Sequence, residues 1–250
     1  MVNKNSIIVY TLIGVFLALK CNPPVKMKSN LIANQFSSNF PFIESKDGKF
    51  ILTNFFSDDD IIIFYNEFTV CSYKIISIDK EGLEDKKINN RQYFIFKKNN
   101  QIGYLYDSSM NKLLEKSNVD SLLSKKFFVG NHFEINDNFF RSSTKKTSKD
   151  EMIVTYLTKK KINISFPDTS IYYFSKKINN GGLSLNSYMD SLFNSKLYKV
   201  RFVFNTSYQE GVLESIPSRE FSVEKKEIKL QNENKVINFI ERFTKEHPNY

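Results

Sequence analysis

The stretch 91-RQYFIFKKNNQIGYLYD-107 indicates the fold more clearly than any other part of the sequence. Two runs rich in aromatic and β-branched residues lie on either side of the polar tetrapeptide 97-KKNN-100. Such residues favour strands, and asparagine tolerates the positive φ angle that a tight turn needs. The stretch therefore predicts a β-hairpin, and with it an antiparallel sheet.

Segments of similar character lie on both sides of this hairpin. A charged turn at Asp58, Asp59 and Asp60 is predicted to separate the first two of them. In 197–205, strict alternation places Leu197 with the odd-numbered residues and Val200 with the apolar even-numbered ones, so one face is buried and the other wet. The predicted strand segments are 49–56, 61–68, 67–78, 127–135, 151–177, 197–205 and 219–230.

Three short helices are expected between and after these strands. Apolar residues at helical spacing predict a helix within 108–126, with Asn118 or Asp120 as its cap. A second helix, 184–195, is expected to turn Leu185, Tyr188, Leu192 and Phe193 inward. The third, 232–247, begins after Asn232 and has an apolar stripe made of Val236, Ile240 and Phe243.

The fold class that follows is α+β, mainly antiparallel sheet with about three short helices including a C-terminal one. Strands and helices do not alternate around glycine fingerprints, which disfavours a doubly wound dinucleotide fold. The 250 residues include 24 Phe and 13 Tyr, enough apolar surface for a sizeable core.

The N-terminus has a different character. The run 6-SIIVYTLIGVFLAL-19 is shorter than the ~20 apolar residues that cross a bilayer, but it matches the hydrophobic region of an export signal. Lys4 precedes it, and Pro23 and Pro24 follow. A run that ends in Cys21 and continues into a polar, proline-containing tether resembles a bacterial lipoprotein signal. The resemblance covers about 25 residues and implies lipidation of Cys21; it departs from the pattern at Lys20, where a small residue is usual.

This pattern predicts three parts of the chain. Residues 1–20 are an export signal or an uncleaved N-terminal membrane anchor, and residues 21–47 are a tether or loop. Residues 48–250 form the α+β domain, with an exposed loop or a seam between two lobes near 141–150. The alternative is that residues 6–19 fold into the core.

The positive charge of the chain is explained by its amino-acid composition. The formal net charge is +9, yet only five of the 36 basic residues are arginine, the residue that grips phosphate in a bidentate fork. Lys, Asn, Ile, Phe and Tyr are all residues of AT-rich codons. Most lysine pairs, such as Lys145-Lys146 and Lys225-Lys226, adjoin apolar runs, where lysine commonly protects strand edges from aggregation. Nucleic acid is therefore not the expected partner.

Familiar catalytic and metal-binding motifs are missing from the sequence. Of the two histidines, His132 lies within a predicted strand and His247 near the end, and the two cysteines and two histidines match no usual metal pattern. Cys71 is expected to be a small buried residue. Paired carboxylates, for which Glu134 with Asp137 and the Asp58–Asp60 triplet are candidates, leave a hydrolase open. We assign no catalytic, cofactor or metal residue; Cys21 is the one candidate site, for lipidation.

The sequence thus favours an extracytoplasmic, membrane-tethered protein of a bacterial cell envelope. Its expected role is binding or structural, with the membrane reached through the N-terminus and an unidentified protein as a further partner. Two rivals stay open: a carboxylate-based extracytoplasmic hydrolase, and a basic nucleic-acid-binding protein.

Overall fold

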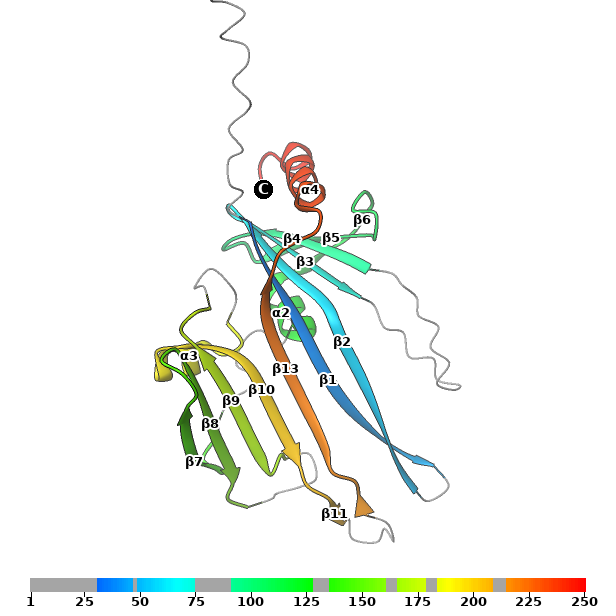
Figure 1. The fold of residues 1–250 in the computed structure, drawn as a ribbon. Helices are drawn as coiled ribbons and strands as arrows, with labels where there is room; N and C mark the ends of the chain where they lie inside the picture. The colour runs from blue at the N-terminus through cyan, green and yellow to red at the C-terminus, as the bar shows by residue number, and fades with distance from the viewer. Residues whose placement is uncertain are drawn as a thin grey trace, which may run out of the picture. The chain divides into compact units, whose positions relative to one another are not determined.

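The computed structural model describes residues 31–46, 49–74, 91–127, 135–160, 166–178, 184–208 and 215–250. These residues form one large antiparallel sheet, a short two-stranded ribbon and three helices, the last of them near the C-terminus (Figure 1). The expectation of a mainly antiparallel sheet with a few helices is confirmed, and the sheet dominates.

The large sheet has eleven strands among the described residues, in the order β6-β5-β4-β3-β2-β1-β13-β10-β9-β8-β7. Its first six strands in the chain are β1 (Ile32–Lys46), β2 (Lys49–Tyr65), β3 (Phe68–Lys74), β4 (Arg91–Lys97), β5 (Ile102–Tyr106) and β6 (Leu113–Asn118). The others are β7 (Phe139–Lys146), β8 (Glu151–Thr158), β9 (Thr169–Ser175), β10 (Lys196–Phe204) and β13 (Arg219–Ile228).

Four smaller or helical elements complete the described chain. Strands β11 (Ser207–Tyr208) and β12 (Ser215–Ile216) pair with each other. The helices are α2 (Val119–Phe127), α3 (Ser187–Phe193) and α4 (Glu233–Glu246).

Asparagine residues in the left-handed conformation close two of the hairpins. The predicted hairpin is confirmed as β4 and β5, and Asn99 in its turn has a φ of 71°. Asn66, with a φ of 54°, closes the turn between β2 and β3 in the same way. Asparagine adopts this left-handed conformation more readily than most residues, which is why these turns end the strands where they do.

The half of the sheet made by β2–β5 is buried on both faces. One cross-strand row is Ile62, Cys71, Phe94 and Leu105, and the next row, on the opposite face, is Ile63, Val70, Ile95 and Tyr104. Because successive residues of a strand point to opposite faces, such strands need apolar residues at nearly every position. This explains runs such as 61-III-63.

Helices α2 and α4 cover these two faces. α2 packs Val119, Leu122 and Leu123 on the first row, and α4 packs Val236, Ile240 and Phe243 on the second. The predicted caps are present: the side chain of Asn118 accepts a 2.9 Å bond from the Ser121 amide, and that of Asn232 a 3.2 Å bond from Lys235. The C-terminal helix and its apolar stripe are therefore confirmed.

The other half of the sheet, made by β13 and β7–β10, is closed on one face. Its buried row is Val223, Val200, Tyr172 and Val154, which lies in the same cluster as residues of α3. The opposite face, which we call the open face, carries the row Glu224, Lys199, Tyr173 and Ile153. In the two core clusters of the described residues, no helix residue packs against this row of the open face.

Ion pairs connect the strands of the open face. Arg201 binds Glu220 through two bonds of 2.7 and 2.5 Å and donates a further bond to the Tyr173 hydroxyl. Lys199 lies 2.8 Å from Glu224. Each charge thus has a partner on a neighbouring strand, which suits a face that stays in water.

Two predictions near the N-terminus are wrong. The expected turn at Asp58, Asp59 and Asp60 lies within β2, which continues to Tyr65. The pairing of β1 with β2 changes register between Phe36 and Ser38, and this irregularity accommodates the polar residues. The expected tether does not include residues 32–46, because these form β1 between β2 and β13. Pairing on both sides stabilises β1 despite its polar composition.

Local periodicity also misled the prediction at two other places. Residues 113–118 form the exposed strand β6, and only 119–127 are helical. In β10, an irregularity in register between Leu197 and Lys199 places Leu197 on the buried face with Val200. Residues 141–146, part of the expected loop or seam, belong to the exposed strand β7.

Candidate functional site

The helix α3 owes its position to two asparagines. The side chain of Asn186 accepts a 2.9 Å hydrogen bond from the Met189 amide at the start of the helix. Asn194 ends the helix in the left-handed conformation, with a φ of 46°, and its amide bonds back to the Asp190 and Ser191 carbonyls. α3 is therefore a short, doubly capped helix immediately before β10.

The inward face of α3 differs from the prediction. Leu185 and Met189 are buried and Phe193 packs against the same core, but Tyr188 is 66% exposed and Leu192 56% exposed. The prediction that Tyr188 and Leu192 point inward is wrong. Met189 occupies the buried stripe, and the next residue, Asp190, is also buried.

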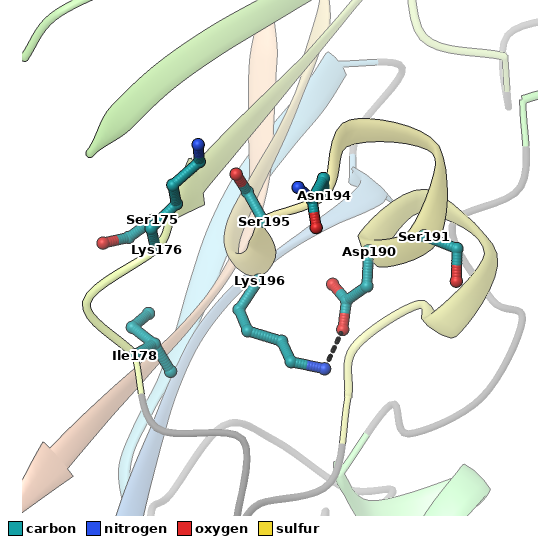
Figure 2. A pocket seen from close by; sticks show the side chains of 8 residues that line it. All are labelled: Ser175, Lys176, Ile178, Asp190, Ser191, Asn194, Ser195 and Lys196. Carbon is teal, nitrogen blue, oxygen red and sulfur yellow. Dashed lines mark hydrogen bonds and ion pairs between the residues drawn. The ribbon is translucent and has the colours of Figure 1, made fainter. Parts of the chain in front are cut away.

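Asp190 is the central residue of this region. Its side chain is 7% exposed and accepts three hydrogen bonds: 2.7 Å from the Leu197 amide, 2.7 Å from the Ser184 hydroxyl and 3.0 Å from the Lys196 ammonium. Figure 2 shows the Lys196 side chain turned toward this carboxylate. The bonds satisfy a buried charge and fasten α3 to the start of β10.

A polar pocket of about 320 Å³ opens beside Asp190. It lies between the end of β9, the C-terminal end of α3 and the start of β10 (Figure 2). We call it the α3 pocket; its lining residues are Ser175, Lys176, Ile178, Asp190, Ser191, Asn194, Ser195 and Lys196.

A second cation stands close to Asp190. Lys225 of β13 is only 3% exposed, and burial lowers the pKa of its ammonium group, while the charge of Asp190 acts in the opposite direction. Lys196 acts on it as a like charge. Lys145 and Lys146 lie on β7, the outermost strand of the described sheet, which is where the prediction placed lysines, whereas Lys225 is buried in β13.

Another hollow, of about 560 Å³, lies where the β2–β3 and β4–β5 turns meet the start of α2. A 2.7 Å bond from the Lys98 amide to the Glu67 carbonyl joins the two turns. Its apolar residues, such as Phe96 and Leu123, are core residues with little exposed surface. It holds no charged side chain as deeply buried as Asp190, so the α3 pocket is the stronger candidate.

The residues predicted from sequence do not gather in either pocket. Cys21, His132 and Glu134 lie outside the described residues. Asp137 is exposed in a turn, and Asp60 accepts a bond from the Lys74 amide. The carboxylate candidates therefore form no pair that the structure describes.

Cys71 and His247 have structural surroundings. Cys71 is a free, fully buried thiol, as predicted, and burial raises its pKa, with a smaller contribution from Asp60. His247 packs its ring 4.6 Å from Tyr104 and 4.7 Å from Phe243, measured between ring centroids. It closes the aromatic cluster beneath α4.

The sequence did not single out Asp190, Lys196 or Lys225. One signal was present: Asp190 is the only charged residue between Lys177 and Lys196. An isolated charge in such a stretch is typical of a buried, partnered group, but its partners come from other elements.

Among the described residues, no group of three or more His, Cys, Asp or Glu side chains is arranged to hold a metal ion. The helices of the same residues are all too short or too polar to cross a bilayer. No protein-family model matches the sequence, and a comparison with curated proteins finds no significant match.

Proposed function

We propose that this chain is an extracytoplasmic protein, tethered to a membrane through its N-terminus, whose folded body works by binding. The location rests on the sequence: the apolar run 6–19, the tether that follows it and the candidate lipidation residue Cys21. The observation that carries the binding role is the α3 pocket, a hollow built around a buried, fully bonded Asp190.

The pocket favours binding over hydrolysis by paired carboxylates. Such hydrolysis needs two carboxyl groups about 5–9 Å apart, one of them able to give or take a proton. The α3 pocket is lined by a single carboxylate, Asp190, and three donors already occupy it. A carboxylate held in this way holds the start of β10 and the end of α3 in place, and the lining offers no second carboxylate to pair with it.

The location is tested by intact mass and cell fractionation of the chain expressed in a bacterial host. Processing and lipidation predict loss of residues 1–20, added acyl mass at Cys21 and recovery in the membrane fraction. Cys21→Ser should remove the acyl mass, whereas Cys71→Ala, which also removes one thiol, should leave mass addition and fractionation unchanged.

Two other outcomes decide against parts of the proposal. A full-length chain in the membrane fraction, unaffected by Cys21→Ser, would replace the lipid with an uncleaved anchor. A full-length chain in the soluble cytosolic fraction would refute export and the tether together.

A further inference from the structure

The walls of the α3 pocket carry several hydrogen-bond donors. The Lys176 ammonium, the Ser195 hydroxyl and the Asn194 side-chain amide line it, and Lys176 and Asn194 are exposed, so these donors are accessible to a ligand. The Ser175 oxygen accepts a 3.2 Å bond from the Lys177 amide, which leaves its own proton free to donate. Ser191 is different, since its hydroxyl donates to the Ser187 carbonyl.

The one carboxylate that lines the pocket is already in use. Both oxygens of Asp190 accept bonds, and its main-chain carbonyl accepts from the Asn194 and Ser195 amides. The Lys176 and Lys196 ammoniums only donate, whereas the serine hydroxyls and the Asn194 side-chain amide can both donate and accept. Such a surface suits a group rich in acceptor oxygens.

Two of the three charged side chains that line the pocket are cations. They are Lys176 and Lys196, and the third is the carboxylate of Asp190. Figure 2 shows the Lys176 ammonium turned away from Asp190, so this cation is not used in the buried ion pair. The end of α3 and two acidic residues of the adjoining chain reduce this positive charge: Glu151, in register with Ser175, and Asp150, whose carbonyl accepts from the Lys176 amide.

We propose that the α3 pocket binds the phosphate group of a small ligand. This inference rests on the proposed binding role and not on the location of the chain. Lysine binds phosphate as a point charge, and hydroxyl and amide donors complete the shell of its several oxygens. A ligand carboxylate has only two oxygens and would use fewer of these donors. A cationic ligand would be repelled by the Lys176 ammonium.

Calorimetric titration of the purified full chain, in a non-ionic detergent, tests the proposal. The probe is inorganic phosphate, with sodium chloride at equal ionic strength as the reference. We expect saturable binding with a dissociation constant on the order of millimolar. Lys176→Gln should weaken it about tenfold, as the loss of one charge-assisted bond predicts.

Two further variants separate the pocket from a general effect of charge. Lys177→Gln removes the same charge one residue away, outside the pocket lining, and should leave phosphate affinity unchanged. Ser195→Ala removes one neutral donor and should weaken binding by a smaller factor, about three- to fivefold. No phosphate heat beyond that of chloride, or equal losses for Lys176→Gln and Lys177→Gln, would overturn the proposal.

A second titration, with glycerol 3-phosphate, distinguishes the possible sources of the phosphate group, because this ester carries the headgroup chemistry of a phospholipid. Tighter binding of this ester than of inorganic phosphate indicates a headgroup or other organic phosphate. Equal binding indicates that the pocket reads the phosphate alone. A chain that reaches the membrane but gives no phosphate heat refutes this inference only, and a soluble chain that binds phosphate refutes only the location.

Discussion

The carboxylate of Asp190 accepts a 2.7 Å hydrogen bond from the backbone amide of Leu197, the second residue of β10. This contact joins a short helix to the strand that follows it and sets the floor of the α3 pocket. We expect Asp190→Asn to lower the free energy of unfolding by about 3 kcal/mol, because it removes a buried carboxylate that pairs with the Lys196 ammonium and acts on the buried Lys225. Urea denaturation measures the change.

The matched control for Asp190 is Asp120→Asn, which removes an exposed carboxylate from the first turn of α2. Its cost should stay below about 1 kcal/mol, the size of a helix-dipole contribution. Equal costs for the two variants would mean that the Asp190 bonds contribute no more than a surface charge.

The two faces of α3 give a second prediction. Met189 is 1% exposed and Tyr188 is 66% exposed, although they are neighbours. Met189→Ala should cost about 2–4 kcal/mol through the cavity it leaves, and Tyr188→Ala less than about 0.5 kcal/mol. Thermal or urea unfolding measures both losses of stability. A larger loss for Tyr188→Ala than for Met189→Ala would support the orientation expected from the sequence.

Gly103 provides a third prediction, from steric contact. A Cβ atom at this position would clash with Cζ of the buried Phe94 ring on the neighbouring strand. Gly103→Ala should therefore destabilise the fold by about 1–3 kcal/mol, the usual cost of overpacking. Unfolding of Gly103→Ala in a Phe94→Leu background should show a smaller penalty; an unchanged penalty would show that the ring is not the obstacle.

The open face predicts an acid-dependent part of the stability. The hydrogen bonds from Arg201 lower the pKa of Glu220, against the effect of burial. This stabilisation is present in full above the ordinary glutamate pKa of about 4.3 and is lost as the pH falls through the lower pKa of the folded state. Unfolding free energies measured from pH 7 to pH 3 should fall less steeply for Glu220→Gln than for the unmodified chain.

The control for the acid dependence is Glu241→Gln, an exposed glutamate of α4. Its pH profile should follow that of the unmodified chain. Because both partners of the Arg201–Glu220 pair are about one-third exposed, the pair itself should contribute no more than about 1 kcal/mol.

Cys71 provides a prediction about thiol chemistry. The thiol is fully buried and its pKa is raised, so little thiolate forms and reagents have no access. Iodoacetamide at pH 8 should leave Cys71 unlabelled in the native chain and label it after denaturation, as peptide mass mapping would show. Labelling of Cys71 at the rate of a free thiol before denaturation would contradict its burial.

Much of the fold was predictable wherever one face or one turn decided it. The hairpin at 91–107 followed from β-favouring runs around an asparagine turn, and α4 followed from its cap at Asn232 and its apolar stripe. These signals are local, since both the turn conformation and the stripe are set by residues a few positions apart.

Elements whose stability comes from distant partners were predicted wrongly. β1 is polar and resembles a tether, yet it pairs with β2 on one side and with β13 on the other, nearly 200 residues away in sequence. The polar residues 57–60 resemble a turn, but the pairing with β1 keeps β2 continuous through a bulge. A backbone ladder satisfies hydrogen bonds regardless of side-chain polarity, so composition alone did not reveal these strands.

The sequence by itself determined the strand-rich class, the C-terminal helix and the buried character of Cys71, because each is indicated by residues close together in the chain. Only the tertiary structure decided the α3 pocket and the surroundings of Asp190, where a helix residue meets Lys196 and Lys225 of two strands. The physical reason is that a buried charge is tolerated only with partners, and which partners it has is settled by how the sheet brings separate segments together.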